Sequence, residues 1–208
     1  MAVSRDRPEG ESVAEGAAGT VVDNPSAKEP NPVVGYDPVA KTLHWLVFVL
    51  MAAQYVVAIT MPDIGRGTVP GRLINLHMSL GLTVLALVVV RWLWRIGDRI
   101  PLATSDMPGW EQPLARIVHS VLYVLLVVNP ILGWMNASAR DWKITVFRLF
   151  ELPHLVARRS ALGRQAGDVH TFLAWVLLAL IGLHVAAALY HAFVRHDGVL
   201  QRMLPGQS

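Results

Sequence analysis

Four apolar stretches without an Asp, Glu, Lys or Arg residue dominate the chain. They cover residues 42–62, 73–90, 117–139 and 169–194, and are 18 to 26 residues long. A helix rises about 1.5 Å per residue, so about 20 residues cross the hydrocarbon core of a bilayer. The pattern therefore predicts an all-α membrane protein, a four-transmembrane-helix bundle with both chain ends on one side. Pro130 interrupts the third stretch and predicts a kink, which membrane helices tolerate.

The segments outside these stretches differ in composition. Residues 1–35 are rich in Gly, Pro, Ala, Ser and Glu and contain no aromatic residue, so we expect a disordered N-terminal tail. No apolar core follows its charged start, which argues against a signal peptide. Residues 36–206 form the expected membrane domain. Its helices are joined by a tight turn at 62–72 and by loops at 91–116 and 140–168, the last being the longest.

Composition supports the membrane interpretation and restricts the chemistry. Hydrophobic residues make up 53% of the chain and charged residues only 16%, well below the charge content of a soluble protein. The aliphatic content excludes a disordered or collagen-like chain. The absence of cysteine excludes disulfide scaffolds, thiolate metal sites, iron–sulfur clusters and thioether-attached haem. The eight histidines are therefore the remaining strong nitrogen ligands.

The charges do not orient the bundle. We call the side that holds both chain ends side A and the opposite side B. The Lys and Arg residues close to the membrane divide almost evenly between the two sides, so the positive-inside rule does not distinguish them. The formal net charge of +3 is small, and the chain is expected to contact membrane lipids and no nucleic acid.

Histidines are the candidate functional residues of the apolar stretches. Six lie within the stretches or at their ends, namely His44, His77, His119, His170, His184 and His191. Ionisable residues inside a membrane are costly and usually functional. Because the stretches contain no charged partner for a proton pathway, and because neutral imidazole is a common ligand of metals and haem, a ligand role is favoured.

Helical spacing sorts four of these histidines into two depths. His170 and His184 are fourteen residues apart, which is roughly 21 Å along a helix and close to four full turns, so they share one face. His44 begins the first stretch near side A, and His77 begins the second near side B. Depth therefore pairs His44 with His184 near side A, and His77 with His170 near side B.

Two stacked pairs of imidazoles fit two b-type haems, each held non-covalently by two histidines in the bundle core. Gly81 near His77 and Gly182 near His184 would admit a flat macrocycle, although small residues also serve helix packing alone. His119 lies near side A and is a rival ligand that the residues themselves do not exclude.

Other interpretations of the histidines stay open. Hydrogen-bonded packing histidines would need no cofactor, and a haem-free transporter or channel with a histidine proton relay is a function of another class. His191 shares the His184 face near the membrane surface, where it would serve a quinone or cap the helix. His154 and His196 lie in polar segments and are expected to be solvated.

Several segments resemble the bacterial cytochrome b561 family. They are YDPVAKTLHWLVFVLM around His44, INLHMSLGLTVLALVVVR around His77, FELPHLVA in the long loop, and DVHTFLAWVLLALIGLHVAAALYH followed by DGVLQRMLPG. The resemblance spans residues 36–206. It implies haem iron ligands at His44, His77, His170 and His184, and argues against His119. It also implies the bacterial inner membrane, with side A cytoplasmic and side B periplasmic. Ala192 departs from the pattern, because relatives often have a second histidine there.

The resemblance also implies an oxidoreductase that passes electrons between a donor at side B, with superoxide as one candidate, and ubiquinone. The loop at 140–168 carries six basic and three acidic residues, an excess that would steer an anionic donor or contact lipid headgroups. Arg91 and Arg95 near side A and Arg72 near side B are candidates to pair with haem propionates. A haem b anchor subunit that links a partner dehydrogenase or hydrogenase to the quinone pool is the alternative function.

Overall fold

The computed structural model describes residues 37–97 and 109–204, which belong to one compact unit of the chain. The predicted N-terminal tail, residues 1–35, lies outside the described residues. Four long helices account for most of the described chain: α1 (Pro38–Thr60), α2 (Arg72–Gly97), α3 (Glu111–Ala139) and α4 (Ala161–Tyr190). All four are long and apolar enough to cross a membrane. The predicted four-helix membrane bundle is therefore confirmed.

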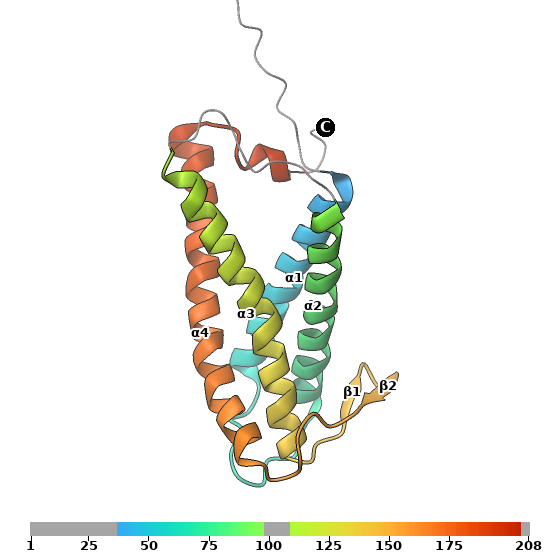
Figure 1. The fold of residues 1–208 in the computed structure, drawn as a ribbon. Coiled ribbons are helices and arrows are strands. Elements are labelled where there is room, and N and C mark those ends of the chain that lie inside the picture. The colour runs from blue at the N-terminus through green and yellow to red at the C-terminus, as the bar shows by residue number, and fades with distance from the viewer. Residues whose placement is uncertain (1–36, 98–108, 205–208) are drawn as a thin grey trace, which may run out of the picture. The chain divides into compact units, whose positions relative to one another are not determined.

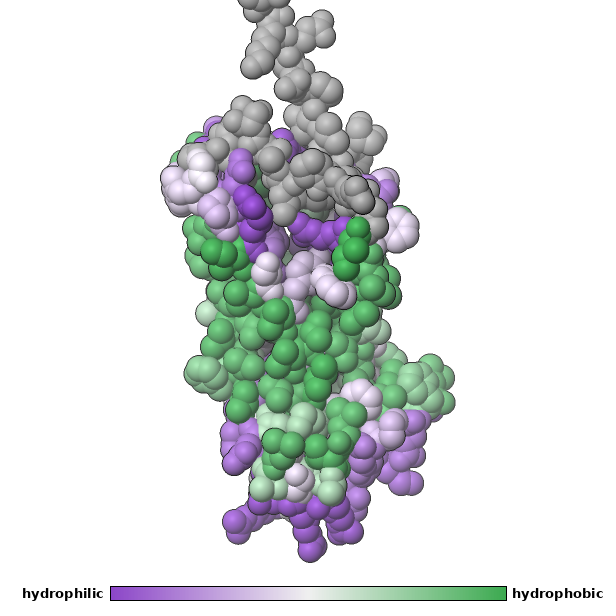
Figure 2. Space-filling model, viewed as in Figure 1, coloured by the Kyte–Doolittle hydropathy of each residue, from purple (hydrophilic) through white to green (hydrophobic). Residues whose placement is uncertain are grey.

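Figure 1 shows the helices side by side. The start of α1 and the short 3₁₀-helix η2 (Gln201–Met203) lie at the same end of the bundle, which is side A. α1 packs most extensively on α2, and α3 on α4. A small apolar cluster lies between the helices. Its buried members are Val47, Met51, Val84, Val88, Leu122, Leu125 and Leu177. Many other Leu, Val, Ile and Phe side chains face outward, where they form the broad apolar band in Figure 2.

The helices extend past the charge-free stretches at several ends. α2 continues through Arg91 and Arg95, and α4 begins at Ala161, eight residues before the stretch at 169–194. Absence of charge marks the part of a helix inside the hydrocarbon, whereas the helix itself ends where its backbone is capped. The Asp37 carboxylate caps α1, and the Ser160 hydroxyl caps α4. The helical conformation of α3 continues through Pro130.

Close backbone approach joins α3 to α4 at side B. A Cβ atom added to Gly163 would lie 2.4 Å from the Ala139 Cβ and 2.9 Å from the Met135 carbonyl oxygen. A Cβ at Gly167, one turn further along α4, would lie 2.6 Å from the Asn136 side chain. Two glycines on one face of α4 thus allow the two helices to meet where larger residues would hold them apart.

The long connection expected as a loop contains a β-hairpin. Strands β1 (Ile144–Val146) and β2 (Phe150–Leu152) pair antiparallel, with Ile144 opposite Leu152 and Val146 opposite Phe150. The Leu149 N–H donates to the Val146 carbonyl and closes the turn. Strands of three residues are too short to display a clear alternation, and the turn contains no glycine, so the pattern gave no sign of this hairpin.

The final turn of the last helix also departs from regular α-helix. After α4 the chain continues as a π-helical segment, η1 (His191–Arg195), and then reverses at His196, whose φ is 52°. π-Helical turns occur frequently at functional sites.

Candidate functional site

His77 on α2 and His170 on α4 face each other toward side B. Their ring centroids are 6.1 Å apart, with the ring planes perpendicular. The His170 Nδ1–H donates to the Asn129 backbone carbonyl, 2.9 Å away, so its Nε2 is the nitrogen that remains for a ligand. Metal-binding histidines typically donate their second nitrogen in this way, which fixes the orientation of the ring.

Some polar atoms in and beside this pair make no hydrogen bond within the described residues. The Gln54 side-chain nitrogen lies 3.3 Å from the His77 Nε2. Among the described residues, the buried His77 Nδ1 and Gln54 Oε1 have no hydrogen-bond partner. Buried polar atoms are normally paired, so orphaned atoms beside two imidazoles fit a site that takes a further polar or metal-containing group.

A cavity of about 970 Å³ opens beside this pair, and His77, His170, Gly81 and Gly133 are part of its lining. A Cβ at Gly133 would lie 3.1 Å from the His170 Cε1, and a Cβ at Gly81 would lie 3.2 Å from the Gln54 Nε2. The absence of side chains at these two positions therefore leaves room for the His170 ring and for Gln54. The cavity and the nitrogen donors suit a large flat cofactor, haem b included.

Three histidines meet toward side A. The rings of His44 on α1 and His184 on α4 have centroids 6.3 Å apart. His119 on α3 lies closer to His184, at 5.1 Å, and donates its Nδ1–H to the Ala115 carbonyl of its own helix. The structure thus brings together the predicted pair and also the rival ligand. A Cβ at Gly182 would meet no atom of the described residues within 4 Å, so helix packing does not require this glycine.

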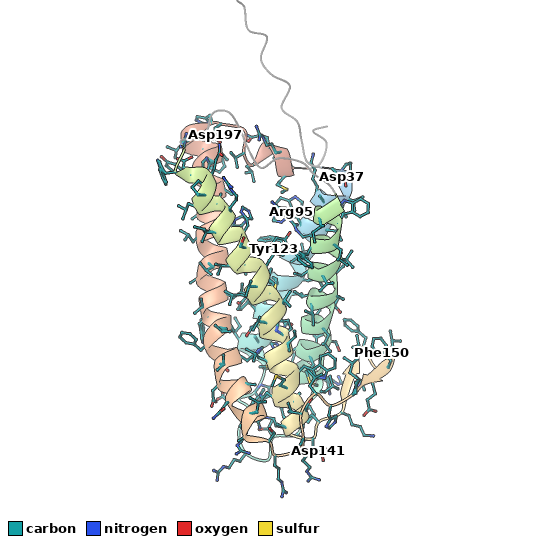
Figure 3. All side chains as sticks on the ribbon, in the orientation of Figure 1. Asp37, Arg95, Tyr123, Asp141, Phe150 and Asp197 are labelled. Atoms are coloured by element: carbon teal, nitrogen blue, oxygen red, sulfur yellow. The ribbon has the colours of Figure 1, made fainter. Side chains whose placement is uncertain are left out.

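A half-buried arginine, Arg91, lies near the side-A histidines. The Arg91 Nε donates to the Tyr123 hydroxyl at 2.9 Å, while its buried Nη1 has no partner within the described chain. Figure 3 places Tyr123 on α3, toward the side-A end of the bundle. A buried N–H of a charged guanidinium is costly unless an acceptor pairs with it, so this arrangement fits a carboxylate that belongs to a bound group.

A polar network closes the side-A end of the bundle. The His191 Nδ1–H donates to Asp197 at 2.6 Å, and Arg195 pairs with Glu111 and lies 3.5 Å from Asp197. Burial alone would raise the pKa of Asp197, but the hydrogen bonds from His191 and the Val199 N–H, with the charge of Arg195, lower it overall. This network could not be predicted from the sequence, because His191 and Asp197 are six positions apart and a π-helical turn lies between them.

The remaining predicted residues fall outside these sites. His154 and His196 are exposed, as expected of solvated side chains. In the side-B connection, Arg140 donates to the Gly65 carbonyl at 2.9 Å, and Arg158 lies 3.3 Å from Asp141. These two members of the basic loop are thus engaged within the protein. Arg164 is engaged in the same way, because it donates to the Arg159 carbonyl at 2.6 Å, although it stays exposed. The other exposed basic residues there are Lys143, Arg148 and Arg159.

Comparisons with known proteins cover most of the chain. The sequence profile described as prokaryotic cytochrome b561 matches residues 35–206. The chain is 29% identical to cytochrome b561 homolog 2 of Escherichia coli K12, over 81% of this chain and 90% of the relative. It is 29% identical to the probable superoxide oxidase CybB of Yersinia pestis, over 78% and 92%, and 30% identical to a cytochrome b562 of Cereibacter sphaeroides, over 82% and 95%.

Proposed function

The chain belongs to the prokaryotic cytochrome b561 family of membrane electron-transfer proteins, and on that premise we propose that it carries two b-type haems, one near each membrane surface. The observation that carries the proposal is the pair of facing imidazoles at each of two depths, His77 with His170 and His44 with His184. Roughly 21 Å of helix separates the two histidines on α4, which supports two separate cofactors.

Distances between the rings support the two pairs. The centroid separations of 6.1 Å for His77 and His170 and of 6.3 Å for His44 and His184 are alike, as expected if each pair would hold the same kind of group. His119 lies 5.1 Å from His184, a separation unlike that of the His77–His170 pair, and this supports His44 over His119 as the second ligand.

Haem b, when bound, supplies one-electron oxidation and reduction at its iron. The residues around it would set its position and access. His77 and His170 would hold the haem iron from two sides of the cavity, and the Asn129 carbonyl would hold the His170 ring in its tautomer. Arg91, oriented by the Tyr123 hydroxyl, would pair with a propionate near side A.

The proposed reaction passes electrons from a donor at side B, which we take as periplasmic, to ubiquinone. Superoxide is the favoured donor because the relative from Yersinia pestis is named a probable superoxide oxidase and because the side-B loop presents exposed basic residues to an anion. Each superoxide would give up one electron and leave as O2, and the quinone would take up two electrons and, from the solvent, two protons to form the quinol. Two haems could hold the two electrons, which matches a donor of single electrons to a two-electron acceptor. The chain ends would lie on the cytoplasmic side of the bacterial inner membrane.

Spectroscopy of the purified protein tests the cofactor assignment. We expect two b-type signals in a reduced-minus-oxidised spectrum and two haems per chain by pyridine haemochrome. His170→Ala should remove one signal, whereas His154→Ala, a substitution of an exposed histidine, should leave both. Retention of both signals in His170→Ala would overturn the side-B pair, and absence of haem from the intact protein would revive the histidine-lined transporter.

Stopped-flow kinetics test the donor and the acceptor. Superoxide should reduce the oxidised haems, and a soluble ubiquinone analogue should reoxidise them. If superoxide leaves the haems oxidised and a partner dehydrogenase or hydrogenase reduces them, the anchor-subunit function replaces the proposed one. If quinone fails to reoxidise them, the proposed acceptor is wrong.

A further inference from the structure

We infer that the β1–β2 hairpin is an anchor in the membrane interface at side B, with lipid covering its apolar tip. This proposal concerns a surface, and it stands apart from the haem chemistry. The tip exposes three large apolar side chains: Phe147 is 47% exposed, Leu149 79% and Phe150 55%. Such a cluster at the end of a projecting hairpin is costly in water, and so it indicates a surface that something apolar covers.

The pairing register makes the hairpin amphipathic. Side chains alternate between the faces of a strand, so Ile144, Val146, Phe150 and Leu152 share one face of the pair, and Thr145 and Glu151 share the other. Ile144 is 1% exposed and packs with Ile74 and Trp142. The apolar face thus begins in contact with the bundle and continues outward to Phe150, while the opposite face is polar.

The hairpin is held firmly in this projecting position. The Ser79 hydroxyl on α2 accepts from the Phe147 N–H at 3.0 Å. Its single proton is shared between the Asn75 carbonyl of its own helix, 2.9 Å away, and the Thr145 carbonyl of β1, 3.2 Å away. A two-stranded hairpin is marginal alone, so these contacts with α2 define its direction. At the turn, Phe147 and Arg148 adopt φ values of 46° and 64°, which bulky residues rarely adopt. Strained backbone at the two exposed residues Phe147 and Arg148 indicates that the conformation of the turn serves a purpose.

Lipid is the occupant that the location favours. Figure 2 shows the apolar edge of the hairpin level with the lower part of the apolar band of the helices, with hydrophilic residues beneath it. Figure 3 places Phe150 beside the bundle, whereas Asp141 lies at its side-B end. The tip therefore continues the surface that the helices already present to lipid. The exposed Arg148 at the turn and Lys143 before β1 would reach the phosphates of the headgroups.

Cysteine accessibility tests the anchor directly, because the natural chain contains no cysteine. Phe150→Cys and Leu149→Cys are compared with Glu151→Cys, a matched control on the polar face of the same strand. Each haem-loaded variant is placed in nanodiscs of phosphatidylethanolamine and phosphatidylglycerol that hold one copy each. It is then treated with a water-soluble, membrane-impermeant maleimide. The labelling rate of each thiol in nanodiscs is divided by its labelling rate in SDS, which corrects for differences in intrinsic reactivity.

The thiols at 149 and 150 should react on the order of tenfold more slowly than the thiol at 151, because maleimide attack needs a hydrated thiolate. Equal rates at the three positions would overturn the proposal. Protection that appears only when a nanodisc holds two copies would assign the tip to a second copy of this chain. Protection that appears only when a partner protein is added would assign it to that partner, and either result would also overturn the lipid anchor. Haem content, read from the same samples by absorbance, reports the proposed function separately.

Discussion

Gly163 is the position where the spacing of α3 and α4 is most sharply defined. An alanine there would bring its Cβ to 2.4 Å from the Ala139 Cβ, 2.9 Å from the Met135 carbonyl oxygen and 3.0 Å from a Val156 methyl group. Carbon atoms in contact prefer about 3.5–4.0 Å, so the shortfall at Ala139 exceeds about 1 Å. The Met135 oxygen belongs to the backbone and cannot rotate away, so α3 and α4 would have to separate.

The cost follows from two opposing effects. Overpacking a well-filled site costs about 1–3 kcal/mol, and replacing glycine by alanine in a helix returns up to about 1 kcal/mol. We therefore expect Gly163→Ala to lower the free energy of unfolding by about 1–2 kcal/mol. Gly182→Ala on the same helix is the matched control for helix propensity, because its Cβ would meet no atom of the described residues within 4 Å, and it should leave the stability of the polypeptide unchanged or slightly raised. Loss of haem absorbance in this variant would instead report the room that Gly182 leaves for a cofactor.

Equilibrium unfolding in mixed detergent micelles with increasing SDS, followed by circular dichroism, measures both variants. The haem absorbance of the same samples reports whether separation of α3 from α4 also disturbs the His170 hydrogen bond to the Asn129 carbonyl. If Gly163→Ala and Gly182→Ala unfold at the same SDS concentration as the natural protein, the close packing deduced at Gly163 is wrong.

Further predictions concern the side-A site and the polar network. His44→Ala should remove the side-A haem signal while His119→Ala retains it; loss in His119→Ala and retention in His44→Ala would exchange their roles. Arg91→Gln should lower the midpoint potential of the side-A haem measured by redox titration, because a nearby, half-buried positive charge favours the electron-rich reduced state; an unchanged potential would place its charge away from the haem. The lowered pKa of Asp197 predicts a contribution to stability that is full above the ordinary aspartate pKa of about 3.9 and is lost as the pH falls through the lower native value. Asp197→Asn should remove that part of the acid dependence, which melting temperatures across the acid range would measure; an identical profile in the variant would refute it.

The features of the fold that depend on long regular helices could be predicted from the sequence. Charge-free stretches of about twenty residues predicted the four membrane helices, since backbone groups in lipid have few alternatives to a helix. Helical periodicity placed His170 and His184 on one face, and chain direction paired them in depth with His77 and His44. The structure brings these rings together, and their role as haem ligands stays a prediction.

Contacts that depend on local backbone geometry could not be predicted from the sequence. The hairpin turn uses positive φ at Phe147 and Arg148, which no turn preference of these residues indicates. The depth of His119 in the membrane could be predicted, but its contact with the His184 ring could not, because the rotation of α3 about its axis decides that contact. The approach of His191 to Asp197 depends on a π-helical turn that moves the side chains out of ordinary helical register.

The pairing of the helices has a consequence for how the protein matures. The strongest contacts join α1 to α2 and α3 to α4, so the chain divides into two helical hairpins that can insert one after the other during synthesis. Each proposed haem takes one histidine from the first hairpin, His44 or His77, and one from the second, His184 or His170. Neither half of the chain can therefore complete an axial pair alone. Haem loading would wait until α4, the last helix to emerge from the ribosome, has entered the membrane, and a half-synthesised chain would hold no fully ligated, redox-active iron.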